Sequence, residues 1–600
     1  MMSTAKDGAA TWKSDLVLAL FATLMSVAIN AATGFRGLFD AGGDNDSLLQ
    51  LVQVRDLLAG QGWFDLHQYR MGLEGGFVMH WSRLLDAPLA LSILAASAIT
   101  GSVPLAEQVV QVVWPALLFW LTLFFTARAA RSFGGDGVLV PTVIIGAAAY
   151  HFLGVYSPGS LDHHNIQLML TMASLSLLLD APARPWIALP SGICAALTLA
   201  IGMESAPYAG TLGALAAILF LVDGASERQV ARNFGLGFAG VSVFAFFATV
   251  PMRAWGEAQC DAFSVVHFVV GVIAGTGLAA IVTIGAANRT RGRRAVSLGL
   301  LAIGLGATTV LLFPQCLAAP YANLDPRLKE LWLDHINEAQ SLLTLLTTDP
   351  ARVPARYGTP LVAIALMAVR LVRGGWRRQD SVVGALLGVA FLVSAWEIRG
   401  STFSIAFAVI PLSAWVAKWR QRAQSASSRG AALRLAAVWL LSVNAVWTGA
   451  AAAASVALDP KAIDVAAADA DKACEKKATY ETLGRMPDTT VLAFSNLGSP
   501  ILAYTGHRVF AGPYHRNVAG NLLAMDAFLG SADEARRIVT AHHVGLVAIC
   551  AGNPESGVLT KKAPRGFLAG MLRGDVPEWL EPVAESKGGP MALYRVRQAG

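Results

Sequence analysis

Residues 263–286 read FSVVHFVVGVIAGTGLAAIVTIGA and contain no Asp, Glu, Lys or Arg. This stretch is longer than the ~20 residues that an α-helix needs to cross the hydrocarbon core of a bilayer. Four arginines follow within residues 289–294, and the positive-inside rule places such residues on the cytoplasmic side of a membrane helix. The segment therefore predicts a transmembrane helix that ends in the cytoplasm.

The rest of the chain repeats this pattern. Of its 600 residues, 55% are hydrophobic and 14% are charged, against roughly 25% charged in soluble proteins, and the mean hydropathy is +0.52. The predicted fold class is a polytopic α-helical membrane protein with roughly thirteen helices. Their approximate bounds are 15–35, 104–126, 137–156, 164–180, 185–202, 205–222, 233–252, 263–286, 295–313, 359–373, 380–398, 401–417 and 432–455.

The net charge of +6 does not indicate a nucleic-acid partner, because the basic residues form short clusters between the apolar stretches. All clusters fall on one side if the amino terminus, with Lys6 and Lys13, is cytoplasmic. An odd number of helices then puts the carboxyl terminus outside. We expect a multi-pass protein of the bacterial inner membrane, surrounded by membrane lipids. The first stretch is long for a cleaved signal, so we expect it to be retained.

Three long segments, residues 36–103, 314–358 and 456–600, face outward by the same count, as does the short segment 157–164. We expect a transmembrane domain over residues 1–455 and a small periplasmic α/β domain over residues 456–600. In the tail, alternating apolar residues predict strands at 491–494 and 544–549, and a charged stretch predicts a helix at 533–539. Asn496, Gly498 and Pro500 predict turns.

Four of the five cysteines lie on the outer side in this topology. Cys260 and Cys316 follow outer helix ends, while Cys474 and Cys550 lie in the tail. Each pair either forms a disulfide, as an oxidising compartment permits, or consists of ordinary small apolar residues. Cys194 lies within a predicted membrane helix and is expected to be free.

Acidic residues gather in the outer segments. Asp44 and Asp46 flank Asn45 just before a predicted helix at 48–59, which Gly60 ends. Asn45 or Asp46 caps this helix in the simplest interpretation. Two carboxylates this close together also suit Mg²⁺ or Mn²⁺, which prefer oxygen ligands.

The second outer segment carries Asp162, His163 and His164. Either Asp162 caps the next helix and the histidines are interfacial polar residues, or the three side chains together bind a metal ion. An imidazole ligand favours Mn²⁺ or Zn²⁺ over Mg²⁺. Glu338 lies in the segment 314–358; its local pattern is that of an ordinary helix surface, although loops of this length are usually functional.

Three more outer residues are candidates for substrate contacts. Arg399 follows a predicted helix, where its guanidinium fork suits a pair of phosphate oxygens; otherwise it snorkels to the interface. Glu204 lies at a helix end, and acidic residues near hydrocarbon are costly and usually functional. His80 either contacts substrate or anchors the interface beside Trp81.

These motifs, in this order, resemble those of the oligosaccharyltransferase catalytic subunits, of the bacterial and archaeal single-subunit type, within the C-type (GT-C) superfamily of membrane glycosyltransferases. The resemblance covers roughly residues 15–455. The three matching segments are Asn45-Asp46 with Arg55-Asp56 and Ala59-Gly60, then Gly159 to His164 in the Asp-x-His form of archaeal members, and then His335-Ile336-Asn337-Glu338.

The resemblance implies roles for individual residues. Asp46, Asp162 and His164 would bind Mn²⁺ or Mg²⁺, Asp46 and Glu338 would be catalytic, and Arg399 would hold the donor phosphates. We add Asp44, His163, Glu204 and His80 as candidate substrate-binding residues. The implied reaction is the inverting transfer of a sugar or oligosaccharide from a polyprenyl phosphate or pyrophosphate to a glycan, lipid or protein acceptor.

The sequence also departs from the family. It lacks the Trp-Trp-Asp motif with which the family recognises protein acceptors. Residue 335 is His instead of the Thr in which part of that recognition resides in the family. The tail instead has polar clusters at 504–508 and 512–517, which either overhang the site or are strand ends and turns. Transfer of a single sugar from a polyprenyl monophosphate therefore remains an alternative. A transporter or flippase is disfavoured, because the acidic residues gather at one membrane edge rather than near the midplane.

Overall fold

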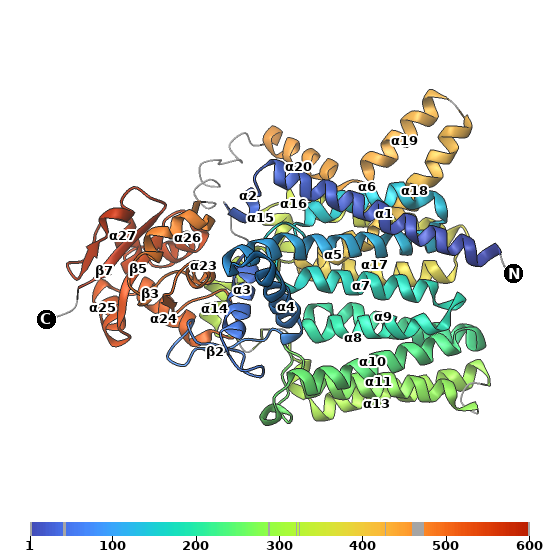
Figure 1. The fold of residues 1–600 in the computed structure, drawn as a ribbon, viewed down its shortest axis with the longest axis horizontal. Helices are drawn as coiled ribbons and strands as arrows, with labels where there is room; N and C mark the ends of the chain where they lie inside the picture. Colours follow the sequence, from blue (N-terminus) through green and yellow to red (C-terminus); the bar gives the residue numbers. More distant parts are fainter. Residues whose placement is uncertain are drawn as a thin grey trace.

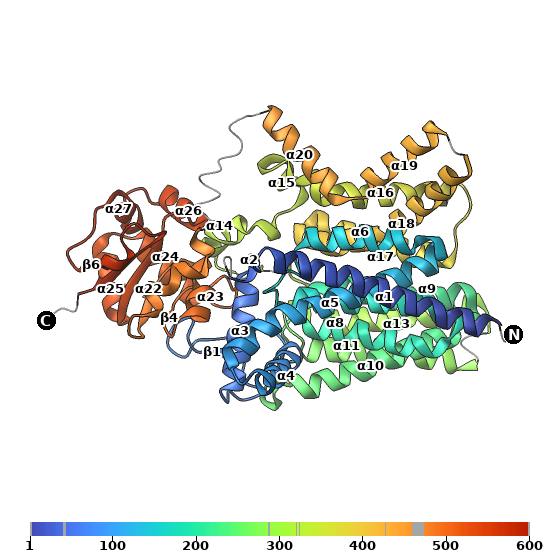
Figure 2. The same ribbon diagram turned by 45° about the horizontal axis from the view of Figure 1, so that its top comes forward.

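The computed structural model describes residues 3–39, 44–285, 289–319, 321–322, 324–426, 428–458 and 473–597. The chain forms a bundle of long helices and a C-terminal region that contains a sheet, at opposite ends of the long axis (Figure 1). Most bundle helices run side by side along this axis in both views (Figures 1 and 2). Their bounds are α1 Ser3–Ala32, α5 Val103–Gly134, α6 Leu139–Leu153, α7 His163–Asp180, α8 Ala188–Ile201, α9 Ala206–Asp223, α10 Arg228–Thr249, α11 Val265–Thr283, α13 Arg291–Leu312, α16 Arg352–Val372, α17 Arg378–Trp396 and α18 Ser401–Ala426.

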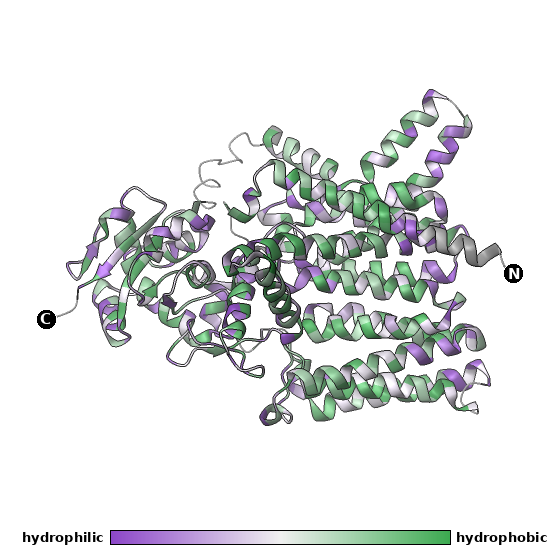
Figure 3. Ribbon diagram, in the orientation of Figure 1, coloured by the Kyte–Doolittle hydropathy of each residue, from purple (hydrophilic) through white to green (hydrophobic). Residues whose placement is uncertain are grey.

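The bundle has the composition of a membrane domain. Within the described ranges, 12 helices are long and apolar enough to cross a bilayer, or up to 13 if a bent pair counts as one span. Hydrophobic residues cover most of their length, and hydrophilic residues gather toward the helix ends (Figure 3). The predicted class, a multi-pass helical membrane protein, is confirmed.

One predicted loop and two predicted helices differ from the structure. α4, Arg83–Thr100, lies in the segment that was predicted to be an outer loop, and Figure 1 shows it inclined steeply to its neighbours. Arg83 and Asp86 interrupt its apolar pattern, but they neutralise each other at 2.7 Å with side chains that are each 1% exposed. The predicted helix 185–202 is the shorter α8. The predicted helix 432–455 is two helices, α19 Arg429–Leu441 and α20 Asn444–Leu458, bent by 81°.

Basic residues from distant parts of the sequence meet at the end of the bundle that carries the amino terminus. Arg131 near the end of α5 pairs with Asp15 in the first half of α1. Arg378 at the start of α17 pairs with Glu227, which precedes α10. The basic clusters thus share one end of the bundle, opposite the C-terminal region (Figure 1).

The outer segments fold onto the other end. Before α4 come α2 Arg36–Phe39, α3 Asn45–Leu58 and the antiparallel strands β1 His67–Gln68 and β2 Phe77–Val78. The segment between α13 and α16 contains α14 Pro326–Leu331 and α15 Leu342–Thr348. A disulfide joins Cys260, in the α10–α11 connection, to Cys316 at the start of this segment.

The C-terminal region has a five-stranded sheet in the order β4-β3-β5-β7-β6. β3 is parallel to β4 and β5, whereas β7 is antiparallel to β5 and β6. The predicted strands correspond to β3 and β5, and the predicted charged helix to α25. The bounds are β3 Thr490–Leu492, β4 Arg508–Val509, β5 Val544–Cys550, β6 Leu580–Pro582, β7 Met591–Val596, α22 Glu481–Gly484, α23 Ser495–Tyr504, α24 Val518–Leu529, α25 Ala532–Ala541, α26 Pro554–Lys562 and α27 Phe567–Arg573.

Two further predictions concern this region. The turns expected at Asn496, Gly498 and Pro500 are wrong, because all three lie inside α23. Gly498 serves close packing instead: a Cβ there would lie 2.2 Å from the carbonyl oxygen of Ala511. A disulfide between Cys474 and Cys550 is present, as is the one between Cys260 and Cys316, and Cys194 is free.

The core of the C-terminal region extends into the outer segments. One cluster of buried side chains contains Leu49 of α3, Met71 and Trp332 together with Leu497 and Val547. Polar contacts reinforce this junction at the carboxyl end of α23, whose last carbonyl groups lack partners within the helix. Arg55 donates to the Ala503 carbonyl at 2.7 Å, and Arg70 donates to that of Leu502 at 3.0 Å.

Candidate functional site

One serine holds the first two predicted motifs together. Ser47, in the first turn of α3, is 2% exposed. Its hydroxyl oxygen accepts hydrogen bonds from the N–H groups of Leu161 at 3.0 Å and Asp162 at 3.3 Å, just before α7. The two motifs are 114 residues apart in sequence, and this serine places them against each other.

Asp44 and Asp162 each cap a helix. An oxygen of Asp44 accepts from the N–H of Ser47 at 2.7 Å, and an oxygen of Asp162 accepts from the N–H of His164 at 2.9 Å. Burial raises the pKa of Asp162 to about 6, the Asp44 charge acting in the same direction and His164 against it. The capping interpretation of Asp162 is therefore confirmed, and the same side chain also lines the cavity that is described below.

Asp46 is not a cap. Because Asp44 takes that place, the prediction that Asn45 or Asp46 caps α3 is wrong. Partial burial, together with the charges of Asp44 and Glu338, raises the pKa of the Asp46 carboxyl well above its ordinary value. The hydroxyl of Tyr514, from the C-terminal region, lies beside this carboxyl group and 3.0 Å from the carbonyl oxygen of Asn45.

The third motif and Arg399 are joined through the backbone. Glu338 lies in a short 3-10 turn at Asn337–Ala339, and Arg399 lies in another at Ile398–Gly400, between α17 and α18. The N–H of Ile398 donates to the carbonyl of Gln340 at 2.9 Å. Arg399 pairs with Glu397 at 2.6 Å.

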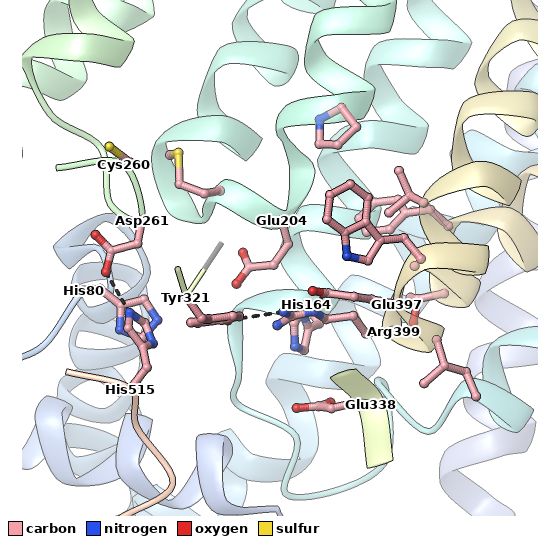
Figure 4. Close-up of a pocket in the computed structure, with 18 of the residues that line it drawn as sticks. His80, His164, Glu204, Cys260, Asp261, Tyr321, Glu338, Glu397, Arg399 and His515 are labelled. Carbon is pink, nitrogen blue, oxygen red and sulfur yellow. Dashed lines mark hydrogen bonds and ion pairs between the residues drawn. The ribbon is translucent and has the colours of Figure 1, made fainter. Parts of the chain in front are cut away.

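These segments enclose a cavity of about 1230 Å³ at the end of the bundle that faces the C-terminal region. All predicted site residues line it except Asp46 and His163. His163 is buried, and its Nε2 lies 3.5 Å from Glu204, which does line the cavity. In Figure 4, Arg399 and Glu397 lie on one side, Glu204 and His164 in the middle, and Glu338 below them. The sequence-predicted residues thus converge on one space.

The structure adds residues that sequence reasoning missed. Asp261, from the α10–α11 connection, lies 2.8 Å from His515 and binds Arg516 through two hydrogen bonds of 2.7 Å each. The His80 ring lies 4.6 Å from that of His515. Burial and the neighbouring His515 and Arg516 lower the pKa of His80 to about 3, although Asp261 opposes them. The predicted cluster 512–517 therefore reaches the site, whereas nothing in the sequence marked Asp261 beyond the adjacent cysteine.

Tyr321 is the other residue that sequence reasoning missed. Its hydroxyl accepts from Arg399 at 3.3 Å, and its ring lies 5.2 Å from that of His515. Its φ of +62° is in the left-handed region, which is unusual for a residue with a bulky side chain. No sequence signal indicates this conformation. The predicted cluster 504–508 does not reach the site, since His507 is buried between the backbones of Thr489 and Leu483.

Four carboxylates and one imidazole in this part of the structure are donors that suit a hard divalent cation. They are Asp46 and the four residues whose charges act on it, Asp44, Asp162, His164 and Glu338. Within the described ranges, however, no three His, Cys, Asp or Glu side chains lie close enough to hold an ion directly. The ligand set Asp46, Asp162 and His164 therefore stays a prediction.

No family model matches the sequence, and no curated protein matches it by sequence. Solved structures do match the fold. The archaeal oligosaccharyltransferase AglB from Archaeoglobus fulgidus, in complex with an inhibitory peptide and a dolichol-phosphate, is similar with a TM-score of 0.64 and 15% identity, over 90% of this chain and 69% of that one.

Two further structures of the Archaeoglobus fulgidus oligosaccharyltransferase agree. One is tethered to an acceptor peptide that contains the NVT sequon, with a TM-score of 0.63 and 15% identity over 98% of this chain and 74% of that one. The other is a complex with Zn and sulfate, with a TM-score of 0.60 and 14% identity over 89% and 67%. The resemblance expected from the motifs is thereby confirmed at the level of the fold, which this chain shares with the archaeal oligosaccharyltransferase.

Proposed function

We propose that this protein transfers a sugar or an oligosaccharide from a polyprenyl-linked phosphate donor to an acceptor, at the membrane face that carries the C-terminal region. The observation that carries the proposal is the convergence of Asp44, Asp162, Glu338 and Arg399, from four distant segments, on one cavity. That the similar structures are oligosaccharyltransferases supports the same chemistry. The basic clusters at the opposite end support an orientation with that end in the cytoplasm.

In this proposal, Arg399 binds the phosphate that leaves the donor. As the bond between the anomeric carbon and the phosphate oxygen breaks, its electron pair goes to the phosphate, whose growing negative charge the guanidinium stabilises. Glu397, at 2.6 Å, and Tyr321, at 3.3 Å, hold Arg399 in place. A divalent ion held by Asp46, Asp162 and His164 would supply further neutralisation of the phosphate.

Asp46 and Glu338 act on the acceptor. Either carboxylate orients the attacking group, and for a hydroxyl acceptor it takes the proton as the new bond to the anomeric carbon forms. Attack from the face opposite the phosphate inverts the configuration, so an α-linked donor gives a β-linked product.

The site residues limit the chemical class of the acceptor less than that of the donor. One similar structure carries an acceptor peptide, but this chain lacks the Trp-Trp-Asp motif. Its C-terminal region instead presents His515 to the cavity, paired with Asp261. Glycan, lipid and protein acceptors all remain within the proposal, as does transfer of a single sugar.

The test uses purified full-length protein with a lipid extract from its own cells, with and without Mn²⁺, and identifies glycosylated products by mass spectrometry. Asp46→Ala and Glu338→Ala are expected to lower turnover by about 10²- to 10⁴-fold, the usual contribution of a general base. Glu330→Ala is the matched control. Glu330 lies in the same outer segment but pairs with Lys562 on the surface, away from the cavity. Wild-type turnover in both site variants would show that the site is assigned wrongly.

A further inference from the structure

The disulfide between Cys260 and Cys316 lies in the wall of the cavity, since both cysteines line it. It joins the α10–α11 connection to the start of the segment 314–358, across a sequence separation of 56 residues. Figure 4 shows Cys260 beside Asp261 at one side of the cavity. Neither cysteine takes part in the chemistry proposed above, and the bond therefore acts through the residues that it holds.

The α10–α11 connection is firmly fixed on both sides of Cys260. Before it, the N–H of Gln259 donates to the Ser264 hydroxyl oxygen at 3.2 Å, and this hydroxyl donates back to the Gln259 carbonyl at 2.6 Å. After it, Asp261 accepts two hydrogen bonds of 2.7 Å from Arg516. Because Ser264 is the N-cap of α11, this end of the disulfide is attached both to the helical bundle and to the C-terminal region.

The stretch 314–324, at the other end of the disulfide, has weaker attachments. Its described backbone hydrogen bonds are local turns, such as that from the N–H of Leu324 to the carbonyl of Tyr321 at 3.0 Å. Most side chains of residues 314–319 are exposed, and Leu317 is 57% exposed. A stretch with few buried contacts opens at little cost in free energy. The disulfide is therefore the strong link between this stretch and the opposite wall of the cavity.

Tyr321 follows Cys316 by five residues and has a backbone conformation that needs support from outside. Its φ of +62° lies in the left-handed region, and bulky residues keep such a conformation only where the surrounding structure enforces it. Its hydroxyl accepts from Arg399 at 3.3 Å and its ring lies 5.2 Å from that of His515. The first contact is long for a hydrogen bond, so a covalent link nearby supplies the firmer constraint.

We propose that the Cys260–Cys316 disulfide positions Tyr321, and through it the Arg399 guanidinium, so that the site is complete only in the oxidised protein. The role given to Arg399 rests on the proposed function, whereas the effect of the disulfide on Tyr321 does not. Reduction by the phosphine TCEP breaks the S–S bond into two thiols and converts the phosphine to its oxide, with water supplying the oxygen and both protons. The site then loses its tie to the α10–α11 connection.

The experiment measures binding of undecaprenyl monophosphate to the full-length protein in phosphatidylcholine nanodiscs, before and after mild reduction with TCEP. Cys260 is exposed, whereas Cys474 and Cys550 are 2% and 0% exposed, so the cavity disulfide should be reduced first. Alkylation of a separate aliquot, followed by mass spectrometry, identifies the broken bond. Reduction should raise the Kd about three- to tenfold, since a typical hydrogen bond contributes about half to one decade in affinity.

Tyr321→Phe tests whether the disulfide acts through Tyr321. This variant lacks the hydroxyl that meets Arg399 and should raise the Kd by a similar factor. Its reduction should add nothing further, because the contact is already lost and the two changes are coupled. Two effects whose factors multiply would overturn the proposal, as would an unchanged Kd after reduction of the wild type.

A pair of double variants separates positioning from general stability. Cys260→Ala with Cys316→Ala should raise the Kd without any reductant. Cys474→Ala with Cys550→Ala is the matched control, since it removes a disulfide of similar sequence separation, 76 residues, whose cysteines do not line the cavity. The control should lower the melting temperature and leave the Kd unchanged. A higher Kd in both double variants would overturn the proposal.

Other outcomes are also decisive. If the control variant does not fold, wild type in enough urea to lower its melting temperature as far as the first double variant takes its place, and an equal rise in Kd there overturns the proposal. A wild type that binds no undecaprenyl monophosphate and transfers no sugar from its lipid extract refutes the proposed function itself. A wild type that binds and transfers equally well before and after reduction refutes only the role of the disulfide.

Discussion

Ser47→Ala is the sharpest test of the claim that the site is assembled from distant segments. Ser47 touches no candidate substrate, yet its hydroxyl oxygen is the acceptor for two buried N–H groups, those of Leu161 and Asp162. Alanine removes that acceptor without adding bulk. We expect the start of α7 to move away from α3 so that water can reach both N–H groups, which separates Asp162 from Asp46.

The magnitude follows from the two hydrogen bonds. A buried N–H left without a partner costs about 1–3 kcal/mol. Since both groups share one oxygen and the second contact is long, at 3.3 Å, we assign about 2–4 kcal/mol to the pair. At ~1.4 kcal/mol per tenfold, turnover should fall by between about 30-fold and about 1000-fold. The Mn²⁺ concentration for half-maximal activity should rise with it.

The assay is sugar transfer from lipid extract as a function of Mn²⁺, with a thermal unfolding scan of each variant. Ser413→Ala is the matched control, because Ser413 is also fully buried but donates back to Val409 within its own helix at 2.6 Å. It should keep wild-type turnover. If Ser47→Ala keeps wild-type turnover and Mn²⁺ dependence, the link between the two motifs does not support catalysis.

Three further outcomes are expected. Arg83→Met leaves the buried Asp86 carboxylate without its ion-pair partner, so it should lower the free energy of unfolding by about 3–5 kcal/mol. The double variant Arg83→Met, Asp86→Leu should recover much of that loss. A small change in the single variant would contradict this expectation. Burial raises the pKa of Asp261, but hydrogen bonds from His515 and Arg516 outweigh it and hold the pKa below the ordinary value. The stability from this contact is therefore present above about pH 4 and lost as the pH falls through the lowered pKa, so the gap in melting temperature between wild type and Asp261→Asn should begin to narrow below about pH 4; a gap independent of pH would refute the assignment. Chelation with EDTA should abolish transfer, and added Mn²⁺ should restore it more fully than Mg²⁺ because of the imidazole ligand; transfer that persists in EDTA would remove the metal from the mechanism.

Much of the architecture was predictable, because the bilayer imposes a simple rule on sequence. Long apolar stretches with basic ends give the helices and the shared position of their charged ends. The rule fails at α4, because Arg83 and Asp86 near its start lower the hydropathy of an otherwise apolar helix. In the structure these two charges neutralise each other in the interior. It also fails at the bend between α19 and α20, where hydropathy alone does not register a break of 81°.

The candidate site was predictable only where its residues form local motifs. Asp162 and His164 stand close together in the sequence, and so their chemistry is visible there. Asp261 and His515 are 254 residues apart, and each is an ordinary polar residue until the fold joins them.

The interior shared by the C-terminal region and the outer segments limits how such a protein can diversify. Leu49 and Met71 complete a core to which Leu497 and Val547 contribute from the other side. A tail grafted from a relative would leave unfilled space against α3, and each missing large side chain would cost about 2–5 kcal/mol. New acceptor preferences are therefore reached more readily by single replacements around the cavity than by recombination of whole modules.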